Sequence, residues 1–89
     1  MPRLVFSERF VDDLACIKTS KLESEILAGL DAIEVFGEFG STNVPESIKC
    51  EFGDGVRKVA VNPSDLIYTL HPDEDVACIE ALIHQRAAW

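Results

Sequence analysis

Residues 56–89 read VRKVAVNPSDLIYTLHPDEDVACIEALIHQRAAW, and this stretch decides the fold of the chain. Two groups of turn-forming residues, 62–65 (NPSD) and 72–75 (PDED), divide it into three short segments rich in strand-forming residues. Short strands joined by tight turns pair with their neighbours in antiparallel order. The sequence therefore predicts a three-stranded antiparallel meander over residues 56–62, 66–71 and 76–83.

The last of these segments is apolar at almost every position, with Glu80 as the exception. A strand that is apolar on both faces is buried on both faces, so we expect this strand to lie in the middle of its sheet. The carboxylate of Glu80 then needs a partner. It shares strand parity with His84, and an ion pair with His84, Lys58 or Arg57 is the expected arrangement.

Ahead of the meander, residues 3–6 form a short apolar run that predicts one more strand. Ser7 is suited to cap a first helix that ends near Thr19. The Ser20-x-x-Glu23 pattern is a capping box and predicts that Ser20 caps a second helix, which ends at Gly37. The apolar positions of this second helix recur at helical spacing. They are Leu22, Ile26, Leu30 and Ile33.

Residues 40–55 are mostly connection, because they hold Ser, Thr, Asn, Pro and Gly among few apolar residues. A short helical turn is expected from Pro45 to Phe52, and a tight turn at Asp54–Gly55. The predicted order is thus one strand, an antiparallel pair of helices, and the meander that completes one sheet. Because the helices must bury their apolar stripe on a face of that sheet, the fold class is two-layer α+β.

The chain has 89 residues, which suits a single domain over 1–89. No apolar run is long enough to cross a membrane, and no signal peptide is recognisable at the start, so we expect a cytoplasmic protein. Three widely spaced cysteines indicate reduced thiols rather than disulfides or a metal site, and no cofactor is expected. The net charge of −8 disfavours binding of nucleic acid by the whole surface.

Four stretches resemble motifs of one protein family. Residues 6–14 (FSERFVDDL) fit the loose opening fs..A..DL, and residues 55–61 (GVRKVAV) resemble the strand motif glRrlpV. Residues 62–68 (NPSDLIY) resemble gpylIfY, and residues 81–86 (ALIHQR) resemble VlHgrR. In this order and spacing they resemble the RelE/ParE superfamily of bacterial toxins from type II toxin–antitoxin systems, nearer its ParE-like branch.

The resemblance implies the RelE/ParE-like fold and a cognate antitoxin protein as partner. ParE-like members poison DNA gyrase, whereas RelE-like members cleave messenger RNA on the ribosome. A homodimer, or a hetero-oligomer with the antitoxin, is compatible with it. The resemblance also implies a role in plasmid stabilisation and growth inhibition.

The candidate binding residues lie on the strands and on the tail that follows them. Arg57 could stabilise a phosphoryl group, and a structural pairing with upstream acids explains it equally well. For Lys58 we favour a solvated strand position. Tyr68 could present its hydroxyl at an open sheet face, although a half-buried tyrosine with a satisfied hydroxyl is the commoner outcome.

The tail holds the sharpest candidates. His84 suits proton transfer near neutral pH, and Arg86 suits phosphate binding. Trp89 could stack on a base. If the chain were a nuclease, its catalytic residues would come from Arg57, Tyr68, His84 and Arg86.

The sequence has no cation at Leu66 or Ile67 and has Gln85 where the family's tail is often basic. We therefore favour a ParE-like toxin that binds a protein target. A RelE-like messenger RNA endonuclease and an inactive toxin-fold interaction module are the alternatives.

Overall fold

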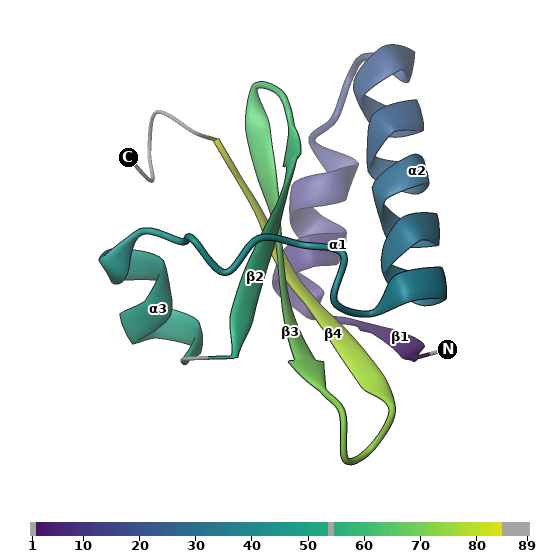
Figure 1. Ribbon diagram of the computed structural model, residues 1–89. Helices are drawn as coiled ribbons and strands as arrows, with labels where there is room; N and C mark the ends of the chain where they lie inside the picture. Colours follow the sequence, from purple (N-terminus) through teal and green to yellow (C-terminus); the bar gives the residue numbers. More distant parts are fainter. Residues whose placement is uncertain (1, 54, 85–89) are drawn as a thin grey trace.

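A computed structural model of the chain describes residues 2–53 and 55–84. Helices and strands follow one another in the predicted order, which confirms the α+β class (Figure 1). The elements are β1 (Arg3–Phe6), α1 (Glu8–Ala15), α2 (Ser20–Phe36), α3 (Glu46–Phe52), β2 (Val56–Val61), β3 (Ser64–His71) and β4 (Val76–His84).

The four strands form one sheet in the order β1-β4-β3-β2. β2, β3 and β4 make the predicted antiparallel meander, and β1 joins it by pairing in parallel with β4. The apolar β4 is therefore a central strand, as predicted. β1 and β2 are the two edge strands.

The main core lies between one face of the sheet and the helices α1 and α2 (Figure 1). The apolar stripe of α2 faces this core, as its helical spacing predicts, and contributes Ile26, Leu30 and Ile33. Burying a side chain of this size contributes about 1.5–3 kcal/mol. The sheet contributes buried side chains from three strands, which are Val61, Leu66, Tyr68, Ala77 and Ile79.

A smaller core lies on the opposite face of the sheet, under α3. Val44 and Ile48 pack there against side chains of β2, β3 and β4, which are Val56, Ile67 and Ala81. The predicted helical turn is confirmed over Glu46–Phe52, although Pro45, expected as its first residue, is its N-cap. α3 thus adds a partial third layer to the predicted helix-on-sheet arrangement.

The helix boundaries confirm some of the predicted caps and correct one. Ser7 caps α1 as predicted, since its Oγ accepts a hydrogen bond from the N–H of Phe10. α1 ends earlier than predicted, at Ala15. The prediction that Ser20 caps α2 was wrong: the carbonyl of Thr19 already accepts the first helical bond, from Glu23 N–H at 3.2 Å, so Ser20 lies inside the helix.

α2 ends at Gly37, which confirms the predicted cap. Gly37 has φ +64°, a conformation that glycine adopts without the steric cost that a Cβ would add. β3 begins at Ser64, so the turn before it is shorter than the predicted 62–65. The predicted turn at Asp54–Gly55 lies partly outside the described residues.

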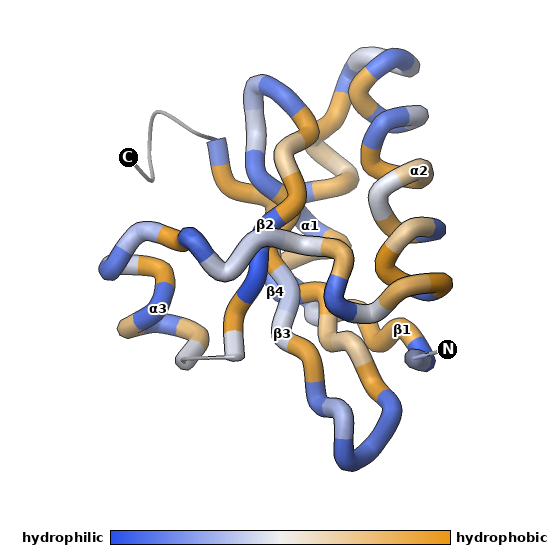
Figure 2. The backbone as a smooth tube through the Cα atoms, in the orientation of Figure 1, coloured by the Kyte–Doolittle hydropathy of each residue, from blue (hydrophilic) through white to orange (hydrophobic). Residues whose placement is uncertain are grey.

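The hairpin between β3 and β4 carries its polar residues at the tip, as the sequence predicts (Figure 2). Residues 72–75 are all exposed there, whereas Val76 and Ala77 of the adjoining strand β4 are buried. Among the helices of the described ranges, none is both long and apolar enough to cross a bilayer.

Candidate functional site

Arg57 and Tyr68 are cross-strand partners on β2 and β3, and both contact the loop after α2. The Nη1 of Arg57 donates a hydrogen bond to the carbonyl of Gly40 at 2.9 Å. The Tyr68 hydroxyl donates to the carbonyl of Gly37 at 2.8 Å and accepts from the N–H of Gly40 at 2.7 Å. The two predicted site residues therefore hold the 37–40 loop against the sheet.

Tyr68 is fully buried. Burial raises the pKa of its phenol above the usual value, which outweighs the opposing effects of the Gly40 N–H and the Arg57 charge. The phenol is thus a neutral group with both of its hydrogen-bonding roles filled. Its place on a binding or catalytic surface stays a prediction, and one that requires the 37–40 loop to move away.

Lys58 and Arg57 lie on opposite faces of the sheet because they are adjacent on a strand. Arg57 shares the face of the main core with Val59, whereas Lys58 shares the face covered by α3 with Val56. The backbone of Lys58 also exchanges two hydrogen bonds of 2.9 Å with Ser41, which covers part of the β2 edge.

His84 is the exposed last residue of β4 and pairs with Ser64. Arg57 pairs with Tyr68, which lies on β3 four residues after Ser64. At about 3.3 Å per residue the two side chains are separated by roughly 13 Å along the sheet. The structure thus does not bring them together, and the predicted Arg86 and Trp89 lie outside the described residues.

Glu80 does not form the predicted ion pair. In the described residues its carboxylate accepts a hydrogen bond from the thiol of Cys78 at 3.0 Å, and the salt bridge found there joins Arg9 to Glu51. The cause is a bulge: Ile67 pairs with Ala81 and Tyr68 pairs with Ile79, so Glu80 is an extra residue without a partner on β3.

The bulge also overturns the predicted parity of Glu80 and His84. Ile79 and Leu82, three residues apart, both pack on the main core, whereas regular alternation would put them on opposite faces. His84 has the parity of Leu82, and Glu80 lies with Cys78 on the face that α3 partly covers. The two side chains therefore lie on opposite faces of the sheet.

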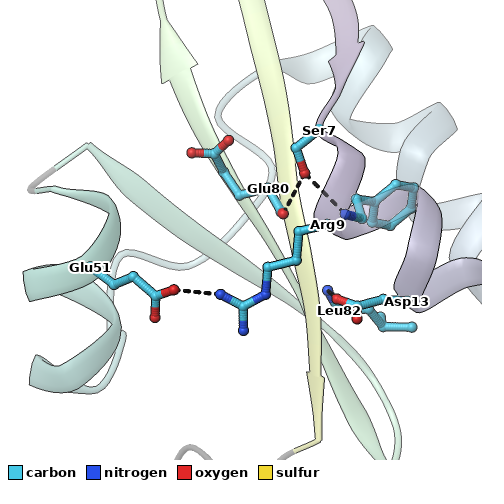
Figure 3. Close-up of polar contacts among 7 residues, drawn as sticks. Ser7, Arg9, Asp13, Glu51, Glu80 and Leu82 are labelled. Carbon is cyan, nitrogen blue, oxygen red and sulfur yellow. Dashed lines mark hydrogen bonds and ion pairs between the residues drawn. The ribbon is translucent and has the colours of Figure 1, made fainter.

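The displaced backbone at the bulge anchors α1 (Figure 3). The hydroxyl of Ser7 donates to the carbonyl of Glu80 at 2.6 Å while it caps the helix. Nearly two helical turns further on, Asp13 Oδ2 accepts a hydrogen bond from the N–H of Leu82 at 3.1 Å. These contacts fix α1 to β4 at two points.

A polar cluster lies on the face that α3 partly covers. Thr69 and Cys78 are direct cross-strand partners. His71 Nε2 is 3.3 Å from Thr69 Oγ1, and Glu80 accepts from Cys78. We call Thr69, His71, Cys78 and Glu80 the sheet-face cluster. The sequence did not single out this cluster, because only the register of β3 and β4 and the bulge bring the four residues together.

Arg9 borders this face and joins α1 to α3 (Figure 3). Its guanidinium bridges to Glu51 and lies 5.6 Å from the centre of the Phe52 ring. The sequence gave no sign of this contact, because it links two helices more than 30 positions apart. No group of three metal-binding side chains occurs in residues 2–53 and 55–84.

The thiol of Cys78 in the sheet-face cluster has a raised pKa and is therefore mostly protonated near neutral pH. Burial first, and then the hydrogen bond and charge of Glu80, raise the pKa of Cys78 to about 11. Because the thiolate is the nucleophile, Cys78 is unsuited to nucleophilic catalysis near neutral pH.

We expect Cys78 to react about 100-fold more slowly with iodoacetamide at pH 8 than a thiol at the usual pKa of 9.0. Replacing Glu80 by Gln removes the neighbouring charge, so the pKa falls and the rate rises several-fold. Alkylation of each cysteine is followed by mass spectrometry, with the exposed Cys16 and Cys50 as internal references. Equal rates for Cys78 and Cys16 in the unaltered protein would contradict the masking.

No family model and no curated protein matches the sequence. Solved structures of similar fold include chains of two toxin–antitoxin complexes. A chain of the intact Escherichia coli RelBE toxin–antitoxin complex superposes with a TM-score of 0.71 at 12% identity, over 94% of this chain and 96% of that chain. For a chain of the Staphylococcus aureus YoeB–YefM complex the TM-score is 0.68 at 19% identity, over 96% and 98%. At these identities the likeness establishes a shared fold.

Proposed function

We propose that this chain is the toxin of a bacterial type II toxin–antitoxin pair, that it works in the cytoplasm, and that it acts by binding a protein target. The observation that carries the proposal is the end-to-end match in fold to chains of two toxin–antitoxin complexes. The order of four family-like motifs in the sequence supports it independently. The first partner is accordingly a cognate antitoxin protein.

The arrangement of the cations favours binding over RNA cleavage. Stabilising a phosphoryl transition state requires cations that converge on one point. Here Arg57 donates to a backbone carbonyl, Lys58 lies on the opposite face, and His84 lies roughly 13 Å further along the sheet. The net charge of −8 adds long-range repulsion between the protein and RNA.

The protein target that we propose is DNA gyrase. This choice rests on the resemblance of residues 55–68 to the ParE-like strand motifs. The contact surface would include Arg57, Lys58 and His84, together with Arg86 and Trp89 in the tail. No cofactor or metal is needed for such a mode of action.

A second candidate is a RelE-like ribosome-dependent messenger RNA endonuclease. It is favoured by the similar structures, since both come from the RelBE and YoeB–YefM complexes. In this reading Arg57 and Arg86 would bind phosphate, and His84 or Tyr68 would transfer protons. A toxin-fold module without activity is the remaining alternative.

Induced expression of the chain alone in a bacterial host should arrest growth, and co-expression of its cognate antitoxin should restore growth. Purified protein should then inhibit gyrase supercoiling and leave ribosome-bound transcripts intact. Cleaved transcripts with normal supercoiling would move the assignment to the endonuclease. Harmless overproduction of folded protein would support the inactive module.

The tail can be tested in the same growth assay. If the C-terminal surface contacts the target, His84→Ala and Arg86→Ala should each relieve the arrest at equal expression level. Leu27→Ala, at an exposed position of α2, serves as the matched control. Full toxicity of both tail variants would remove the tail from the mechanism.

A further inference from the structure

Among residues 2–53 and 55–84, nothing pairs with one side of the β1 backbone. The N–H of Arg3 donates to the carbonyl of Asp75 at 2.8 Å, and the N–H of Ser7 donates to the carbonyl of Ile79 at 3.0 Å. Because alternate residues of a strand point to opposite sides, Leu4 and Phe6 direct their backbone groups away from β4. β1 is the last strand of the sheet, so these groups form an open edge.

Apolar surface flanks this open edge. The Phe6 side chain is 47% exposed and Val5 is 39% exposed. The Phe6 ring stacks on Phe10 at 5.8 Å, which holds it in place. Phe6 also separates two open hollows. The first, of about 440 Å³, is lined by Pro2, Arg3, Leu4, Phe6 and Glu34, and the second, of about 240 Å³, by Phe6, Glu8, Val11 and Asp12.

We propose that a second copy of this chain pairs its β1 with this β1 in antiparallel order, so that two four-stranded sheets become one. With the two-fold axis at Val5, Leu4 of each copy lies opposite Phe6 of the other. Both residues direct their N–H and C=O outward, so the two pairs form four backbone hydrogen bonds. Pro2 has no N–H and ends the ladder.

Charge selects this antiparallel arrangement. Arg3 lies at the start of β1, and Glu8 and Asp12 line the hollow just beyond its end. Antiparallel pairing brings Arg3 of each copy to the acidic end of the other, whereas parallel pairing would place Arg3 against Arg3. The edge is thus complementary to itself in hydrogen bonding and in charge. This is the requirement for an interface related by a two-fold axis.

The axis position gives a sharp test by sedimentation equilibrium at rising protein concentration. The unaltered chain should approach twice its monomer mass. Val5→Glu and Val5→Lys each place like-charged side chains opposite each other across the axis, on Cα atoms about 4.5 Å apart, and should abolish the dimer. An equimolar mixture of the two variants should restore a dimer that contains one copy of each. Circular dichroism checks that both variants fold.

Leu27→Glu is the matched control, because Leu27 is also exposed and apolar but lies on α2. It should leave the dimer intact. A chain that stays monomeric at every concentration overturns the proposal. So does an association that survives Val5→Glu, because it would then use another surface. The proposal is independent of the toxin assignment, since the assay measures mass and not growth.

Discussion

Replacing Gly40 by Ala should lower the free energy of unfolding by about 3 kcal/mol, which is a large fraction of the stability of a small domain. A Cβ at this position would lie 2.7 Å from Tyr68 Cε1 and 2.9 Å from the backbone carbonyl of Lys58. Neither neighbour can move without a loss of stability, because Tyr68 is fully buried and the Lys58 carbonyl accepts a hydrogen bond from the N–H of Ser41. The loop must therefore leave the sheet and lose its bonds to Tyr68 and Arg57.

Gly55→Ala provides the matched control. A Cβ at Gly55 would make only an ordinary contact, 3.8 Å from the carbonyl of Leu70. We expect a change within about 0.5 kcal/mol for this variant, and a drop of about 15 °C in melting temperature for Gly40→Ala. Thermal and urea unfolding followed by circular dichroism measure both. A Gly40→Ala protein as stable as Gly55→Ala would show that the loop is not held as described.

Much of the fold could be predicted because local patterns and burial agree in this chain. The two turn groups fix the meander, and the apolar run of β4 requires a central position, where β4 is found. The stripe of α2 requires an apolar partner, which the sheet and the apolar side of α1 provide. The caps at Ser7 and Gly37 could be predicted because a helix cap depends on the residue itself and on its near neighbours in the sequence.

The errors arose where tertiary contacts decide the local structure. The bulge at Glu80 is stabilised by Ser7, more than 70 positions away, so no pattern within β4 could indicate it. The bulge exchanges the sheet faces on which the side chains after Glu80 lie. For this reason Glu80 and His84 are not on the same face, and the predicted pairing does not form. Ser20 failed as a cap because the turn after α1 begins α2 one residue earlier.

The arrangement of the candidate site residues could not be predicted from the sequence. The polar groups of Arg57 and Tyr68 contact the 37–40 loop, which the sequence showed only as connection, so their role as site residues stays a prediction. The sheet-face cluster escaped notice because Thr69 and Cys78 become neighbours only through strand register. Contacts between distant segments thus determine which polar groups gather on one face.

Tyr68→Phe should lower the free energy of unfolding by about 2 kcal/mol at pH 7, because the change leaves a buried carbonyl at Gly37 and a buried N–H at Gly40 without partners. The pH dependence gives a second readout. Burial raises the pKa of Tyr68 in the folded protein above the usual 10.0, so the folded state resists deprotonation. The stabilisation from the neutral phenol is complete below pH 10 and is lost as the pH rises above it.

The stability gap between the unaltered protein and Tyr68→Phe should therefore be constant up to about pH 9 and narrow above pH 10. Urea unfolding at a series of pH values measures the gap, and phenolate absorbance reports Tyr68 alone because it is the single tyrosine of the chain. Arg57→Lys tests the neighbouring hydrogen bond to the Gly40 carbonyl. It should lower the free energy of unfolding by less than Tyr68→Phe does, because the Arg57 side chain is only partly buried and stays partly hydrated. A gap that widens above pH 10 would mean that the folded protein stabilises the phenolate, and would refute the buried, doubly bonded phenol.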